Sequence, residues 1–258
     1  MALKFVDISV TLDPSLTSDP DIMIPEIDYF THQETAEELC SFFPGLTRDD
    51  LPGGEGWAIE KVRISTHNGT HVDAPWHYHS TMDGGERAIA IDEVPLEWFQ
   101  QPGVKLDFRH FDDGYVVTPA DIEAELKRIG HDLEPLNIIL ANTAAGARYG
   151  HADYVSRGCG FGRDATLWFT ERGIRVVGTD GWSWDAPFIH TKTRWEETHD
   201  PSIIWEGHKA GMECGYCQIE KLGNLEALPA NGFTVSCFPV KIKDASAGWT
   251  RAVAIFEG

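Results

Sequence analysis

The sequence predicts an α/β fold, with mixed strands and helices in a single domain that spans residues 1–258. Segments near both ends of the chain alternate apolar and polar residues and are rich in β-branched side chains, which indicates strands. Residues 118–130 carry the start and stop signals of a helix, and short apolar runs follow it. No repeat, low-complexity stretch or linker interrupts this order, so we expect one shared core.

The N-terminal quarter predicts two strands separated by a long irregular segment. Residues 4–12 and 57–66 alternate as strands do. Between them, residues 17–56 are rich in Pro, Gly, Asp and Glu, with one short helix expected at 34–42. Loops of this length in a domain are usually functional or disordered. We interpret most of this segment as a loop-rich insertion that packs as a cap and is long enough to cover a pocket.

The helix at 118–130 has the clearest signals of the remaining elements. Thr118 is its expected N-cap, Pro119 suits the first helical position and Gly130 ends it. The other expected elements are helices at 93–101 and 164–173 and strands at 104–109, 137–141, 174–178, 233–242 and 251–256.

The composition restricts the partners and the compartment. The formal net charge of −20 disfavours nucleic acid and anionic membranes, which bind clustered Lys and Arg, and it favours cations near the surface. The first residues lack the apolar core of a signal peptide, and no apolar run approaches the ~18 residues of a membrane span. Five cysteines, an odd number without a dense framework, fit a reducing compartment. We therefore expect a cytoplasmic protein.

A cluster of histidines predicts the functional site. His67, His71, Asp73 and His77 lie within eleven residues. An extended strand would point these odd-numbered residues to one face, whereas a helix would turn Asp73 away from the histidines. A straight strand of ten residues covers ~33 Å, too far for side chains that share one ion. The segment must therefore bend, and Gly69 and Pro75 permit bends.

Imidazoles with a carboxylate suit Zn²⁺ or Mn²⁺, and three ligands leave positions open for water and substrate. The alternative is that these are surface or core-capping histidines without an ion. Four such residues in so short a segment favour the metal site.

The pattern His67-x-Gly69-Thr70-His71-x-Asp73-Ala74-Pro75-x-His77 resembles the signature of the cyclase family of metal-dependent hydrolases, which includes kynurenine formamidases and isatin hydrolases. The resemblance extends to residues 6–9, 175–180 and 220–225. It implies a swivelling β/β/α architecture and a homodimer or higher homo-oligomer.

The resemblance also implies roles for single residues. It makes His67, His71 and Asp73 metal ligands and His77 the catalytic histidine. His208 and Glu220 correspond to a distal pair that completes a site for one or two ions; in the branch with one ion, His208 can contact the substrate instead. Without the resemblance, His208 and Glu220 would not stand out.

The expected reaction is hydrolysis of a small aromatic molecule by water activated on the metal, with His77 moving the proton. Trp76, inside the motif, and Trp184 are expected to contact the substrate. Five aromatics between residues 182 and 205 either wall a pocket for a flat ring or belong to the core.

The C-terminal region bears on the substrate. The formamidase branch tends to carry Gly-Ser-Pro-x-Arg, whereas residues 246–251 here read Ser-Ala-Gly-Trp-Thr-Arg. This departure favours opening of a cyclic amide or lactone, as in isatin hydrolases, over hydrolysis of N-formylkynurenine. The rival from another class is a non-catalytic protein that binds a metal or small molecule, and His77 beside a complete ligand set argues against it.

Overall fold

A nine-stranded mixed sheet forms the body of the molecule in the computed structural model, which describes residues 2–257. Its four central strands run parallel to one another, and every strand pair outside these four is antiparallel. Both ends of the chain contribute, because the first strand pairs with the last. In order across the sheet, the strands are β1 (Lys4–Asp7), β15 (Val253–Phe256), β13 (Phe233–Ser236), β7 (Gln100–Asp107), β9 (Ile138–Asn142), β11 (Val176–Thr179), β12 (Cys217–Glu220), β4 (His71–Asp73) and β14 (Ala247–Trp249).

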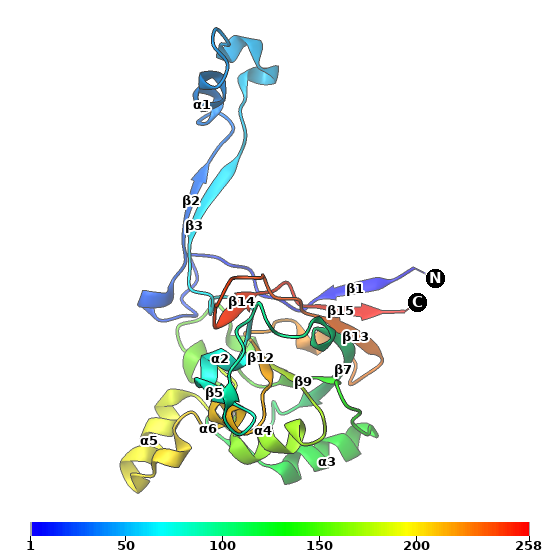
Figure 1. Cartoon of the computed structure of the whole chain (residues 1–258). Coiled ribbons are helices and arrows are strands. Elements are labelled where there is room, and N and C mark those ends of the chain that lie inside the picture. Colours follow the sequence, from blue (N-terminus) through cyan, green and yellow to red (C-terminus); the bar gives the residue numbers. More distant parts are fainter. Residues whose placement is uncertain (1, 258) are drawn as a thin grey trace.

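The sheet is buried on both faces. On β9, Ile138 and Leu140 belong to one apolar cluster, and Ile139 and Ala141 belong to the other. The second cluster lies under α3 (Pro119–Ile129) and α4 (Arg163–Thr170), which cover one face of the sheet (Figure 1). Buried parallel strands read as continuous apolar runs, which is why these were visible in the sequence.

The helix predicted at 118–130 forms as α3. Thr118 and Asp121 make a capping box, Pro119 is the first helical residue and Gly130 ends the helix at φ 63°. The remaining helices and strands are short, apart from α5: α2 (Pro75–Tyr78), α5 (Phe188–Thr198), α6 (Glu206–Lys209), β5 (Thr81–Met82), β6 (Glu86–Arg87), β8 (Val116–Val117) and β10 (Gly160–Phe161). Among residues 2–257, no helix has both the length and the apolar character needed to cross a membrane.

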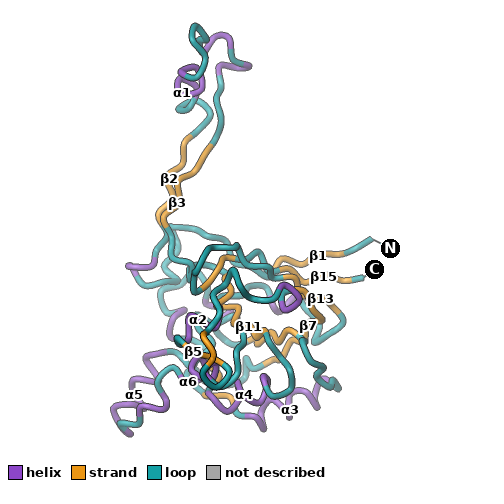
Figure 2. Tube along the Cα trace, in the orientation of Figure 1, coloured by secondary structure: helices purple, strands orange, loops and turns teal. Residues whose placement is uncertain are grey.

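An arm stands away from the body (Figure 1). We define it as residues 26–63: β2 (Glu26–Phe30) and β3 (Ile59–Arg63) pair as an antiparallel ribbon, and α1 (Ala36–Ser41) lies at its tip (Figure 2). The helix expected at 34–42 is confirmed. The expectation that most of residues 17–56 cap a pocket is wrong, because the arm points away from the body that carries it.

Two other expectations from the sequence fail beside prolines. Residues 93–101 form only a single 3₁₀ turn at Leu96–Trp98, and β7 has already begun at Gln100 because it pairs with β13 through Pro102. The strand expected at 233–242 ends at Ser236, three residues before Pro239. In the first case, pairing in the sheet overrides the local helical pattern. In the second, the strand ends shortly before a proline, which lacks the N–H that a strand pair needs.

Candidate metal centre

The histidine segment bends at both predicted positions. Gly69 has a φ of 57°, in the left-handed region, and a Cβ there would lie 2.5 Å from Leu12. The chain then runs straight through β4, and Pro75 starts the one-turn helix α2. These bends bring residues from a turn, a strand and a helix to one point.

The strand β12 supplies a second carboxylate to this point. Glu220 is the register partner of His71 across the antiparallel pair β12–β4. Its Oε2 lies 3.6 Å from His71 Nε2, and its Oε1 accepts a hydrogen bond of 3.0 Å from the backbone N–H of Trp184. Sheet register therefore joins two residues that are far apart in the sequence.

Asp73 lies at the centre of the cluster and is fully buried. Its Oδ1 is 2.9 Å from His67 Nδ1 and 3.3 Å from His71 Nε2. Its Oδ2 is 3.9 Å from His77 Nε2. Two groups of possible ligand atoms share Asp73, each with its atoms within 4.8 Å of one another: His67 with His77, and His71 with Glu220.

His208 on α6 closes the cluster from the opposite side. Its Nε2 lies 3.7 Å from Glu220 Oε1 and 4.0 Å from Asp73 Oδ2. Its Nδ1 is 2.5 Å from Asp185 Oδ2, and the carboxylate of Asp185 also accepts the backbone N–H groups of Gly207 and His208. Asp185 therefore fixes which ring nitrogen faces the cluster.

The buried polar atoms of this cluster fit a divalent cation. His71 Nδ1 contacts the carbonyl oxygen of Gly69 at 2.8 Å, an acceptor that only an Nδ1–H can serve. In the neutral ring, Nε2 then presents a lone pair toward two carboxylates. Neither this nitrogen nor either oxygen of Asp73 makes a well-directed hydrogen bond among the described residues, although Asp73 Oδ1 lies 2.9 Å from His67 Nδ1. Buried acceptors that face one another are costly without a positive charge between them, and nitrogen with carboxylate oxygen is a donor set that Zn²⁺ and Mn²⁺ accept.

The imidazoles differ in their protonation. Burial lowers the pKa of His77 to about 4, despite Asp73, and the other imidazoles add to this effect. Burial also opposes protonation of His71 and His208, but the carboxylates beside them outweigh it and raise the pKa of each. Burial would raise the pKa of Asp73 as well, but the imidazoles of His77 and His71 hold it well below its usual range. The cluster thus places His77, with its lowered pKa, beside the strongly acidic carboxyl of Asp73.

A cavity of about 200 Å³ opens directly onto the cluster. Trp205 stacks on the ring of His208 at 4.3 Å between centroids. Aromatic side chains form much of the wall, so three of the five aromatics noted between residues 182 and 205 line it. The lining residues are Met23, His67, His77, Trp182, Ser183, Phe188, Trp205, His208, Glu220 and Lys221.

Trp76 and Trp184 lie elsewhere. The ring of Trp184 is fully buried and stacks on Phe161 at 3.9 Å, so only its backbone reaches the cluster. Trp76 is 42% exposed and is absent from the cavity lining. Neighbours in sequence on α2 point in different directions, which separates Trp76 from His77.

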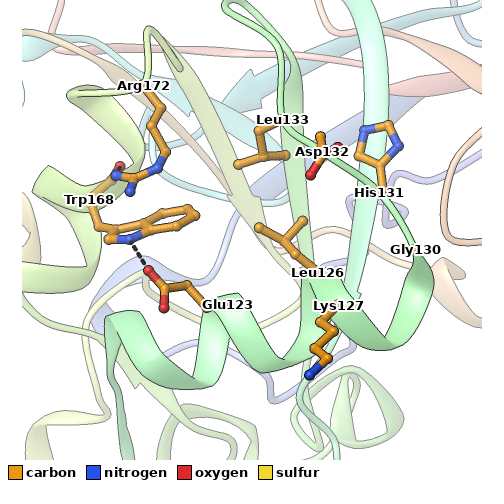
Figure 3. A pocket seen from close by; sticks show the side chains of 9 residues that line it. All are labelled: Glu123, Leu126, Lys127, Gly130, His131, Asp132, Leu133, Trp168 and Arg172. Carbon is orange, nitrogen blue, oxygen red and sulfur yellow. Dashed lines mark hydrogen bonds between the residues drawn. The ribbon is translucent and has the colours of Figure 1, made fainter.

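A larger cavity, of about 710 Å³, lies between α3 and α4 (Figure 3). Its polar groups already contact one another: Arg172 lies 3.6 Å from the centroid of the Trp168 ring, and the indole donates to Glu123 at 3.1 Å. It holds none of the clustered buried acceptors described above. The cluster of histidine and carboxylate side chains, with the smaller cavity that opens onto it, is therefore the better candidate site.

The Cyclase family model, described as "Putative cyclase", matches residues 6–186. The chain belongs to the cyclase family. The match includes the histidine segment and ends before His208 and Glu220, and it confirms the resemblance noted from the sequence.

Known proteins similar to this cyclase-family chain include both plant and bacterial ones. Cyclase-like protein 3 of Arabidopsis thaliana is 25% identical over 229 residues, which are 86% of this chain and 73% of the relative. Isatin hydrolase A from Labrenzia aggregata, solved with benzyl benzoate, has a TM-score of 0.74 at 24% identity and covers 99% of this chain and 94% of its own. Isatin hydrolase A from Ralstonia solanacearum has a TM-score of 0.76 at 21% identity, with 99% and 92% covered. At these identities, the structures show a shared fold, so the expected α/β cyclase architecture is confirmed.

Three supporting residues of this cyclase-family site were not singled out from the sequence. Asp185 orients His208, and Ser246 Oγ lies 3.0 Å from His67 Nε2. Asp19 contacts Lys221 and accepts the indole N–H of Trp182 at 2.7 Å. Each comes from a segment remote from its partner. The only signals in the sequence were the place of Asp185 among the aromatics and that of Ser246 at the start of the sequence that departs from the formamidase pattern.

Proposed function

We propose that this chain is a metal-dependent hydrolase that opens a cyclic amide or lactone of a small aromatic molecule. The observation that carries the proposal is the set of unpartnered acceptors on His71 and Asp73 at the base of an aromatic-walled cavity. His67, His71, Asp73, Glu220 and His208 would hold one or two divalent ions, Mn²⁺ or Zn²⁺. Such an ion, when bound, supplies positive charge that polarises a carbonyl and makes water more acidic.

The chain's own residues account for proton transfer and orientation. With a pKa lowered to about 4, His77 is neutral at pH 7, so its Nε2 can accept a proton and return it to the leaving nitrogen or oxygen. Its ring centroid lies 5.1 Å from that of Trp205, on the cavity wall. Trp182, Phe188 and Trp205 suit a flat ring and exclude water around it.

Two observations support a ring substrate over a formamide. Ser246, which starts the C-terminal sequence that departs from the formamidase pattern, lies beside His67 within the site. The two isatin hydrolases with similar folds are named for a ring substrate. We further propose that the chain acts in the cytoplasm, as its cysteine usage favours, and that it self-associates, as the family resemblance implies.

Metal analysis combined with an activity panel tests the proposal. The purified protein is assayed on a lactam, a lactone and a formamide with and without chelator, and its metal content is measured. We expect hydrolysis of the lactam or lactone that chelator abolishes and Mn²⁺ or Zn²⁺ restores. Activity insensitive to chelator would contradict the proposal, and bound metal without any hydrolysis would favour the non-catalytic alternative.

His77→Ala separates the two roles open to that histidine. As a proton carrier, His77 can be removed with the metal content unchanged and turnover lowered by about 100-fold or more. Because His77 also lies within ligand distance of His67 and Asp73, loss of metal along with turnover would make it a ligand. Ser80→Ala, a change outside the cluster, controls for handling and should affect neither quantity.

A further inference from the structure

Lys221 is a buried cation in the wall of the cavity that opens onto the histidine cluster. Its side chain is 1% exposed, and it is the one lysine or arginine among the residues that line this cavity. Neither the ion binding nor the proton transfer described above uses it. Burying an ammonium group is costly unless an opposite charge and hydrogen bonds surround it, so the contacts of Lys221 indicate its role.

The backbone of Lys221 turns its side chain toward the cavity. Successive residues of a strand point to opposite faces, yet Glu220, the last residue of β12, and Lys221 both line the cavity. Lys221 has a φ of 57°, in the left-handed region, where a residue with a side chain is strained. Its N–H donates to the carbonyl of Gly181 at 3.1 Å, and its own carbonyl accepts the hydroxyl of Thr70 at 2.6 Å. These bonds hold the strained conformation, as is common where a site needs a side chain in a fixed place.

Two of the three N–H groups of the Lys221 ammonium have acceptors. Nζ donates to the carboxylate of Asp19 and, at 3.0 Å, to the backbone carbonyl of His67. It also lies 5.3 Å from the centroid of the Trp182 ring, in the cavity wall. Residues 2–257 provide no further acceptor for it. The third N–H can therefore donate to an oxygen atom of a molecule in the cavity.

Asp19 balances the charge of Lys221 and fixes its position. The Asp19 side chain is 10% exposed, and besides the ammonium it accepts the indole N–H of Trp182 at 2.7 Å and the side-chain amide of Asn68 at 3.2 Å. The pair Asp19–Lys221 carries no net charge. An anion bound beside this pair would be repelled by the carboxylate of Asp19, whereas an uncharged carbonyl oxygen accepts a hydrogen bond without that repulsion.

We propose that Lys221 determines specificity by donating a hydrogen bond to an uncharged carbonyl oxygen of the substrate, other than the carbonyl that water attacks. The attacked carbonyl belongs beside the ion ligands. Lys221 contacts the backbone of His67 and not its ring, which faces Asp73, so it addresses a different part of the substrate. This role rests on the proposed function and deepens it, because it favours ring substrates that carry a second carbonyl.

Calorimetry with ring ketones tests this role without any hydrolysis. The probes are three benzo-fused cyclopentanones, which carry one carbonyl, two carbonyls, or one carbonyl and a carboxylate. Their rings contain no amide or ester bond to cut. Binding is measured on the full chain in the presence of Mn²⁺, and each compound is compared between variants, so that the contribution of the ion to its binding cancels.

The double variant Lys221→Met with Asp19→Asn removes the donor without leaving an unpaired carboxylate. We expect it to bind the two-carbonyl compound about tenfold more weakly than wild type does, and the one-carbonyl compound within about twofold, because only the former offers an oxygen to Lys221. Lys105→Met is the matched control. Lys105 also donates to backbone carbonyls, those of Leu225 and Leu228, but it lies outside the cavity, so all three affinities should stay at their wild-type values.

Asp19→Asn alone tests the charge balance. Asparagine has nearly the shape of aspartate and can still accept the indole N–H of Trp182, but it leaves the charge of Lys221 unmatched. We expect this variant to bind the carboxylate-bearing compound about tenfold more tightly than wild type does. A circular dichroism spectrum and a metal content equal to wild type show that each variant is folded. The single variant decides the question if the double variant does not fold.

Three results would overturn the role of Lys221. The first is no binding of the two-carbonyl compound to wild type, and the second is a double variant that binds it as tightly as wild type does. The third is unchanged affinity of Asp19→Asn for the carboxylate-bearing compound, which would restrict Lys221 to holding the N-terminal segment in place. An intact preference for the second carbonyl without hydrolysis of any lactam or lactone would contradict the proposed function alone.

Discussion

Glu220 and His71 stand directly opposite each other on β12 and β4, with Glu220 Oε2 3.6 Å from His71 Nε2. Neither belongs to a loop. Because both strands are fully buried within one sheet, the distance between the two side chains is set by backbone hydrogen bonding, and the site has little freedom to expand or contract.

Replacement of Asp185 by asparagine should weaken the site through His208. The carboxylate fixes the ring so that Nε2 faces Asp73 and Glu220, and an amide no longer favours this arrangement. We expect metal affinity or turnover to fall by about 10- to 100-fold. Titration with Mn²⁺ or Zn²⁺ followed by kinetics measures both, and Asp200→Asn, at an exposed helix cap, serves as the control. Unchanged affinity and turnover would remove Asp185 from the site.

Metal binding should release protons below neutral pH. The pKa values of His71 and His208 are raised in the ion-free protein, so both rings hold protons at pH 6 more often than a free histidine does. A cation must displace those protons, and its apparent affinity should therefore fall as the pH falls. Calorimetry at pH 6 in two buffers of different ionisation enthalpy gives the number released, which we expect to be at least about one. A binding enthalpy independent of the buffer would contradict this expectation.

Asp180 should make the stability of the protein decrease as pH rises. Burial raises the pKa of this carboxyl to about 7, from 3.8, even though Thr143 and Asn142 donate hydrogen bonds to it. Between pH 4 and 7, the folded state therefore holds a proton on Asp180 that the unfolded state has already lost. The resulting contribution to the free energy of unfolding is fully present below pH 4, decreases as the pH rises, and is lost above pH 7.

Urea unfolding of Asp180→Asn at pH 5 and pH 8 tests this. Asparagine loses hydrogen bonds at both values but cannot ionise. The variant should therefore be less stable than wild type at pH 5 by a larger margin than at pH 8, with a difference on the order of 2 kcal/mol. An equal loss of stability in the variant at pH 5 and pH 8 would show that Asp180 does not titrate between these two pH values.

Trp184, in the core, and Trp205, in the cavity wall, should respond differently to replacement. Trp184→Ala empties a core position stacked on Phe161 and should cost about 3–5 kcal/mol of unfolding free energy. Trp205→Ala removes a cavity wall and should raise KM with a smaller loss of stability. Thermal unfolding and steady-state kinetics on both variants measure these effects. A raised KM for Trp184→Phe at unchanged stability would return Trp184 to the substrate site.

Local sequence patterns predicted the local parts of the site, whereas its non-local parts either required the family resemblance or were missed. Gly69 and Pro75 bend the chain for reasons of backbone sterics, and these can be seen without a structure. The pairing of Glu220 with His71 depends on sheet register, so only family resemblance pointed to it. The position of Asp185 beside His208 depends on how α6 packs, and nothing local encodes that.

The arm shows the same limit at a larger scale. Residues 17–56 read as loop because their polar and turn-forming residues outnumber any periodic signal. The ribbon forms because residues 26–30 find 59–63 across a long separation.

The position of β4 in the sheet has a consequence for biosynthesis. β4 lies between β12 and β14, both from the last quarter of the chain, so His71 and Asp73 leave the ribosome long before the neighbouring strands exist. A nascent chain displays His67, His71 and Asp73 without Glu220 and His208 to complete the set. On the function proposed above, the complete ion site can therefore form only after β12 and α6 have been synthesised, so the ion binds late in biosynthesis.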